Sequence, residues 1–264
     1  MLCLIVSDRK QKQSSKHHLP SNISSNDADN IHSTACPMIA VKLQDPEPST
    51  QQTTLYAHED VLARSSTLLQ DLLKAPPTSN ELHSINLPEA DAKSFNIYIN
   101  WLYTGKIHAG HRKDEAPTKA SPEGYTGLSR LVKCYQLGSR LQDPHFQDAI
   151  LDAIVTIVCI GKTQGKTMLG LIMQRVKHHY IQLPVGSKAR RLFVHLFAHF
   201  GDWRLLEKND PQAFLLETRE VIMRGAAHDL TEAAAKCVFH EHENGKCYRM
   251  LDDVVLPTKA MELR

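Results

Sequence analysis

Two cysteines and two histidines lie within eleven residues near the carboxyl end of the chain, in the pattern Cys237-x2-His240-x-His242-x4-Cys247. Two thiolates and two imidazoles are a suitable ligand set for a tetrahedral structural zinc ion. The spacing is not that of a zinc finger, and histidines two residues apart suit an extended segment rather than one helix face. Two interpretations stay open: a zinc site, and a surface segment with a locally packed cysteine. The spacing favours the second.

Other chemically suggestive motifs lack the spacing that their chemistry needs. Gly161–Thr167 (GKTQGKT) has three residues between its glycines where a phosphate-binding loop has four, so we interpret it as a flexible basic linker. His195 and His199 are one helical turn apart but lack the HExxH pattern, so packing is the default interpretation. No Ser/His/Asp or paired-carboxylate set is recognisable at characteristic spacing, so we expect no enzymatic activity and no small-molecule substrate.

Charge gives no reason to expect nucleic acid or an anionic membrane as a partner. The 264 residues include 31 basic and 29 acidic side chains, for a formal net charge of +2. The clusters Arg175–His179 and Lys188–Arg191 are small, and we interpret them as solvated helix faces. We therefore expect protein partners, including a possible homodimer.

The six cysteines are scattered, unlike the dense pairs of a small disulfide-bonded domain. Reduced thiols in a nuclear or cytoplasmic protein are the expectation, which also disfavours a Cys237–Cys247 disulfide. No segment approaches the roughly 20 apolar residues of a membrane span. The opening MLCLIV is too short for a signal-peptide core.

The first half of the chain has the pattern of a small sheet with flanking helices. Residues 1–36 are polar and are predicted to be a disordered leader. MIAVKL and TTLYA predict a hairpin, HEDVLARSSTLLQDLLK predicts two short helices with Ser66 as the second N-cap, and SINLP predicts a third strand. DAKSFNIYINWLYTG predicts a helix that Gly105 ends, followed by a short strand in KIHA.

The second half is predicted to be mainly helical. Helices are expected over about 124–141 and 144–160, whereas 161–185 is ambiguous apart from the helical character of MLGLIMQRV. Ser187 begins one further helix, and Asp210, followed by Pro211, caps another. We expect an α+β domain over 37–160 and a helical extension with a Cys/His-containing tail over 161–264.

The first half resembles the BTB/POZ domain over about residues 38–158. The string YAHEDVLARSSTLLQDLL, then INLPEADAKSFNIYINWLYTGKI, and then a helix pair follow that family's pattern. The matching positions are His58, Leu62, Ser65, Leu87, Pro88, Phe95, Leu102, Tyr103, Thr104, Gly105, Tyr135, Leu137, Gly138, Leu141 and Phe146. The helical tail with a Cys/His segment is similar to a group of fungal BTB proteins.

The resemblance implies self-association or partner docking in an adaptor role. A dimer surface would use Ile39 and Val41 of the first strand and Val61 and Leu62 of the first helix. His58 is expected to bond backbone at a helix start, as part of the framework.

Two other functions stay open as alternatives. One is a zinc-containing chromatin- or transcription-associated factor. The other is a cullin-type ubiquitin-ligase adaptor, although Ser79 stands where the hydrophobic residue of the cullin-binding triplet is expected, two before Glu81.

Overall fold

The structure is a computed structural model that describes residues 37–44, 52–75, 83–88, 90–108, 126–225, 236–243 and 246–250. The predicted leader, residues 1–36, lies outside these ranges. Within them, no helix combines the length and the apolar character that crossing a membrane requires.

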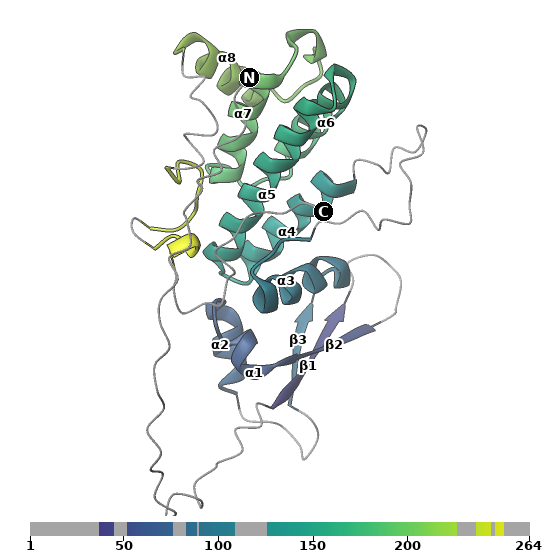
Figure 1. The fold of residues 1–264 in the computed structure, drawn as a ribbon, viewed down its shortest axis with the longest axis vertical. Helices are drawn as coiled ribbons and strands as arrows, with labels where there is room; N and C mark the ends of the chain where they lie inside the picture. The colour runs from purple at the N-terminus through teal and green to yellow at the C-terminus, as the bar shows by residue number, and fades with distance from the viewer. Residues whose placement is uncertain are drawn as a thin grey trace, which may run out of the picture. The chain divides into compact units, whose positions relative to one another are not determined.

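Three strands form one small sheet in the order β2-β1-β3 (Figure 1). β1 (Met38–Gln44) pairs antiparallel with β2 (Gln52–His58), and β3 (Ser84–Pro88) runs parallel to β1 on its other side. The predicted hairpin and third strand are confirmed. The short strand predicted after Gly105 is wrong, because residues 106–108 form no strand.

Local capping explains the helices beside the sheet, which are α1 (Glu59–Leu62), α2 (Thr67–Leu73) and α3 (Ala92–Thr104). The Ser66 hydroxyl accepts a hydrogen bond from the Leu69 N–H and begins α2, as predicted. Asp91 does the same for α3 through two backbone N–H groups. Gly105 ends α3 with φ of 67°, a left-handed conformation that glycine adopts without steric cost.

The remaining helices are α4 (Thr126–Arg140), α5 (Pro144–Thr163), α6 (Lys166–Tyr180), α7 (Lys188–Phe200), η2 (Trp203–Leu205), α8 (Gln212–Met223) and η3 (Tyr248–Met250). Ser187 begins α7 as predicted. The cap predicted for α8 is wrong by one residue, because Pro211 takes that position. The Asp210 carboxylate instead lies 2.9 Å from the Lys177 ammonium of α6.

The predicted linker Gly161–Thr167 is a tight connection between two helices. α5 continues to Thr163, and α6 begins at Lys166 after Gly165, whose φ is 108°. A Cβ atom on Gly161 would lie 2.2 Å from Cδ1 of Ile172, so glycine allows the two helices to pack closely. The interpretation as a flexible linker is therefore wrong.

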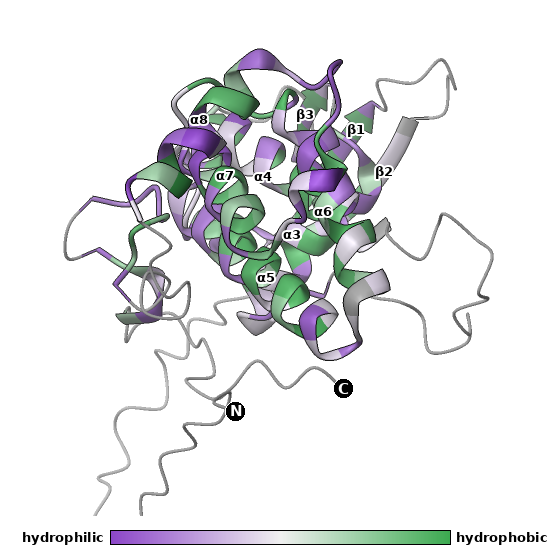
Figure 2. Cartoon of the chain, turned by 90° about the horizontal axis from the view of Figure 1, so that it is seen from above, coloured by the Kyte–Doolittle hydropathy of each residue, from purple (hydrophilic) through white to green (hydrophobic). Residues whose placement is uncertain are grey.

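One hydrophobic core runs through both halves of the described chain, from Ile39 in β1 to Phe239 near the carboxyl end. Figure 2 shows α5 and α7 largely in the colour of hydrophobic residues, as expected of helices inside such a core. The domain boundary predicted at residue 160 falls inside α5. The sheet and the helical extension are therefore physically continuous.

Asp143 is a fully buried carboxylate that joins α5 to α3 and to the turn between α1 and α2. It accepts hydrogen bonds from the Ser65 hydroxyl (2.7 Å), the Tyr98 hydroxyl (2.9 Å) and the Phe146 N–H (2.9 Å). Burial raises the pKa of Asp143 although these bonds oppose the rise. The carboxyl group caps α5 and holds it against α3 and against Ser65 in the turn between α1 and α2.

Replacing Asp143 by alanine is expected to lower the free energy of unfolding by about 3 kcal/mol, because it removes an N-cap and the acceptor of two hydroxyls. Asp143→Asn keeps an acceptor oxygen and should lose less. Urea denaturation of both variants measures the difference. Equal stability of the two variants would contradict this role.

The two helix glycines of α5 and α6 form a matched pair for a second test. Gly161→Ala overpacks the contact with Ile172 and is expected to cost about 1–3 kcal/mol. Gly170→Ala meets no atom within 4 Å and should stabilise the chain by about 0.5–1 kcal/mol, since alanine favours helix. Thermal unfolding of both variants checks the opposite signs, and a stabilising Gly161→Ala would refute the close packing.

Candidate functional site

The residues predicted as a fold framework divide between surface and core, and His58, Pro88, Tyr103 and Thr104 are exposed. Leu62, Leu87, Phe95 and Tyr135 are all buried. A Cβ atom on Gly138 would lie 2.8 Å from the Gln147 side chain, so this glycine sets the close approach of α4 and α5.

His58 and Tyr103 tie the end of β2 to the end of α3. The Tyr103 hydroxyl accepts a hydrogen bond from the His58 backbone N–H (3.1 Å) and lies 2.7 Å from Nδ1 of the same residue. The expectation that the His58 side chain bonds backbone is therefore wrong, because its partner is a tyrosine hydroxyl. Next to it, Thr104 donates to the Asn100 carbonyl within α3.

The four residues suggested for a dimer surface lie in the core instead. Ile39, Val41 and Leu62 are fully buried, and Val61 is 4% exposed. Side chains alternate between the two faces of β1, and Ile39 and Val41 lie on the face that packs against the core. The apolar residues of the short helix α1 also face the core. In the described chain these side chains therefore offer no surface to a partner, and the expectation is corrected.

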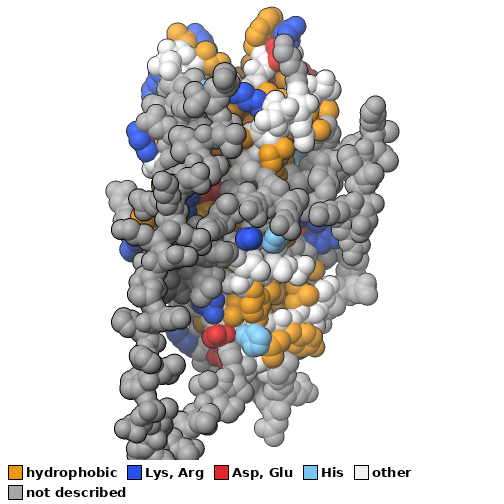
Figure 3. Space-filling model, viewed as in Figure 1, with side chains coloured by type: hydrophobic (Ala, Val, Ile, Leu, Met, Phe, Trp, Pro, Cys, Tyr) orange, Lys and Arg blue, Asp and Glu red, His pale blue; other side chains and the backbone are white. Residues whose placement is uncertain are grey.

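Apolar side chains on the other face of the sheet are exposed. Met38 is 37% exposed and Tyr56 58%, and Tyr103 at the end of α3 is 43% exposed. Met38 pairs with His58, whose ring makes an edge contact with Tyr103, so these side chains are neighbours. Figure 3 shows hydrophobic side chains gathered in the part of the view where Figure 1 draws the sheet.

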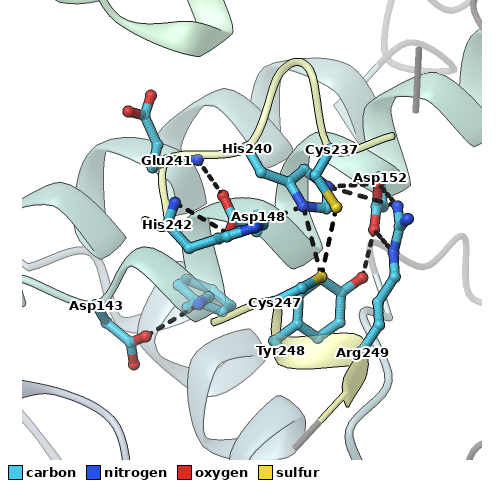
Figure 4. Close-up of polar contacts among 11 residues, drawn as sticks. Asp143, Asp148, Asp152, Cys237, His240, Glu241, His242, Cys247, Tyr248 and Arg249 are labelled. Carbon is cyan, nitrogen blue, oxygen red and sulfur yellow. Dashed lines mark hydrogen bonds and ion pairs between the residues drawn. The ribbon is translucent and has the colours of Figure 1, made fainter. Parts of the chain in front are cut away.

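The structure brings the four predicted metal ligands together. One candidate ligand atom from each of Cys237, His240, His242 and Cys247 lies within 4.8 Å of all the others. The two sulfur atoms are 3.7 Å apart, and the Cys247 sulfur lies 3.8 Å from Nδ1 of His240 (Figure 4). His240 and Cys247 are buried, and the other two are half-buried. The interpretation as a surface segment with one locally packed cysteine does not describe this arrangement.

Two aspartates of α5 lie behind the histidines. Asp148 and Asp152 are four residues apart, so they share one helix face. Asp152 lies 3.0 Å from Nε2 of His240, and Asp148 lies 2.5 Å from Nδ1 of His242. Asp148 also accepts the backbone N–H of Glu241, so it holds both the main chain and a side chain of the segment.

Asp152 also binds the short η3 turn. Its Oδ2 accepts hydrogen bonds from Nε of Arg249, at 2.9 Å, and from the Tyr248 hydroxyl. Burial tends to raise the pKa of Asp152, but the bonds from His240 and Arg249 outweigh it and lower that pKa. Burial first, and contact with Cys247 second, raise the pKa of Cys237 to about 11.

Sequence reasoning missed Asp148 and Asp152. They interrupt an otherwise apolar stretch of α5, QDAILDAIV, where an acidic residue facing the core needs a partner. That pattern is a usable indication of a buried polar site. It does not name the partners, which lie about 90 residues further along the chain.

The other histidine pair does not assemble a site. His195 packs against the ring of Phe239, with centroids 5.2 Å apart. His199 packs against Phe200. The expectation of packing is met for His195, which is buried, whereas His199 is exposed.

The basic clusters contribute to the interior of the helical half. Lys177 pairs with Asp210, and its side chain is 11% exposed. The Arg190 guanidinium lies 4.1 Å from the centre of the Tyr180 ring. For these side chains the interpretation as solvated helix faces is wrong.

Architecture and packing thus define the chain as an α+β module whose sheet is continued by a helical extension. A family model for the BTB/POZ domain matches residues 42–154, so the chain contains a BTB/POZ domain over this part of its length. BTB/POZ domains are protein–protein interaction modules. No curated protein matches the sequence. The match contains Asp148 and Asp152, whereas the four Cys/His residues lie beyond it.

Proposed function

We propose that the chain is a non-enzymatic adaptor of the nucleus or cytoplasm that self-associates through the outer edge of β2. The observation that carries the proposal is that β2, in a domain of an interaction family, is an edge strand without protecting residues. Self-association is frequent among BTB domains, which supports a second copy as the occupant.

The hydrogen bonds at the end of β2 indicate which backbone groups face outward. The Glu59 N–H donates to the Pro37 carbonyl, on the side of β1, whereas the His58 N–H points away from β1 to Tyr103. Because alternate residues of an antiparallel strand face opposite sides, Tyr56 and Thr54 also direct their N–H and carbonyl groups away from β1. No described strand pairs with that edge.

Edge strands usually carry features that prevent pairing with another chain, such as charged side chains, proline or short length. β2 (QTTLYAH) has seven residues and contains no Lys, Arg, Asp, Glu or Pro. The other edge strand, β3, has five residues and ends in Pro88. The contrast favours β2 as the pairing strand.

A second copy fits this edge because antiparallel pairing of β2 with its own symmetry mate forms a closed two-fold interface. The same group of residues is then used twice, and each copy contributes the exposed Tyr56 and Met38 beside the new strand pair. Aromatic and apolar side chains on neighbouring strands stabilise such pairing.

The experiment compares two double variants by sedimentation velocity. Thr54→Lys with Tyr56→Lys places like charges along the β2 edge and should convert a dimer to a monomer. Ser84→Lys with Asn86→Lys adds the same charges at exposed positions of β3 and should leave the dimer intact. A monomeric wild type at about 100 μM, far above the Kd of a specific dimer, would refute self-association. A dimer that survives the β2 charges would refute this edge.

The two alternative functions remain predictions. Ser79 and Glu81, on which a cullin-adaptor role depends, lie outside the described residues. A chromatin role would need free cationic side chains, and Lys177 and Arg190 are engaged within the chain.

A further inference from the structure

We propose that Cys237, His240, His242 and Cys247 bind one structural zinc ion that fastens the carboxyl-terminal segment to α5. The site is independent of the proposed self-association.

The separations between ligand atoms match the edges of a zinc tetrahedron. Zn–S bonds of about 2.3 Å at tetrahedral angles place two sulfur atoms about 3.8 Å apart. The Cys237 and Cys247 sulfurs are 3.7 Å apart, and the Cys247 sulfur lies 3.8 Å from Nδ1 of His240. A disulfide would need about 2.05 Å between the sulfurs. The Cys247 sulfur is thus at tetrahedral spacing from two other ligand atoms, and all four ligand atoms lie within 4.8 Å of one another.

The aspartates of α5 orient both imidazoles for metal binding. A zinc-bound histidine typically donates its other ring N–H to a carboxylate, which fixes the tautomer and the ring orientation. Asp152 accepts from Nε2 of His240 and leaves Nδ1 facing the Cys247 sulfur. Asp148 accepts a hydrogen bond from Nδ1 of His242, so Nε2 of that histidine is available to the metal. Each histidine thus has one nitrogen held and one available.

The backbone is bent to present the first thiol. Cys237 has φ of 57°, which is uncommon for a residue other than glycine. The His240 N–H donates to the Cys237 carbonyl at 3.1 Å, which closes a tight turn and brings the two side chains to the same side. Unfavourable conformations of this kind persist where surrounding interactions compensate for them, and a metal bond at both ends of the turn would do so.

The ligand chemistry selects zinc over harder cations. Thiolates and imidazoles suit zinc, whereas magnesium and calcium require oxygen ligands. Four protein ligands complete the tetrahedron and leave no open position for a substrate, which makes the site structural rather than catalytic.

Zinc at this position would join the BTB domain to the helical extension. Between the two histidines of the segment, the Glu241 carboxylate accepts from the Tyr135 hydroxyl of α4 (2.5 Å) and from the Lys188 N–H of α7 (2.8 Å). Asp148 and Asp152 hold the same segment to α5. The metal would therefore fix a segment that contacts three helices at once.

The first test measures metal in the full chain, purified with a reducing agent and without a metal-affinity tag. Mass spectrometry of the metal content should give one zinc per chain, and replacement by cobalt(II) should give the visible absorption of a tetrahedral thiolate site. Wild-type protein that binds no stoichiometric zinc, even after zinc is added, would overturn the proposal. This measurement does not depend on any variant folding.

The second test uses variants with a matched control. Cys247→Ser should lose the zinc, whereas Cys159→Ser, a half-buried cysteine of α5 outside the cluster, should keep it. Asp148→Asn retains the four ligands and should weaken zinc affinity about 10–100-fold in competition with a chelator. Zinc retained by Cys247→Ser at wild-type affinity would refute the site. So would a Cys237–Cys247 disulfide that persists in wild-type protein purified with a reducing agent.

Discussion

Three aspartates are buried on α5, one of them as its N-cap, and hydrogen bonds from distant parts of the chain compensate for their burial. A carboxylate removed from water costs several kcal/mol unless hydrogen bonds or ion pairs compensate. Asp143 and Asp148 are fully buried, and Asp152 is 8% exposed. Asp143 is satisfied by residues near the sheet, and the other two by the carboxyl-terminal segment. α5 is therefore the helix through which the two halves of the chain depend on each other.

Local features of the fold could be predicted because their causes are local. Ser66, Asp91 and Gly105 act through atoms within four residues of themselves, and the sequence places suitable residue types there. The strands follow from alternation and from turn residues in the same way. The α8 cap was misplaced by one residue because Asp210 has a competing partner, Lys177, on another helix. The Asp210 carboxylate thus binds the Lys177 ammonium and the Glu207 N–H instead of capping α8.

The burial of the four residues suggested for a dimer surface, and the acidic partners of the Cys/His segment, could not be predicted from the sequence, for a related reason. Ile39 and Leu62 are apolar in either role, and only tertiary packing shows that the chain's own helices cover them. The ligand set of the Cys/His cluster was visible in the sequence because its members are within eleven residues. Asp148 and Asp152 come from α5, and no spacing rule connects them to the cluster. A site whose residues lie in one short segment can be predicted from the sequence, whereas a site shared between distant segments can be recognised only in the folded structure.

The hydrophobic core includes residues beyond the segment that matches the BTB/POZ family model. The BTB match ends at residue 154, inside α5, immediately after Asp148 and Asp152. A chain cut at that point would keep both carboxylates and lose the histidines, the arginine and the backbone N–H groups that compensate for their burial. The helical extension and the tail are therefore part of what makes this BTB domain stable, rather than an independent module attached to it.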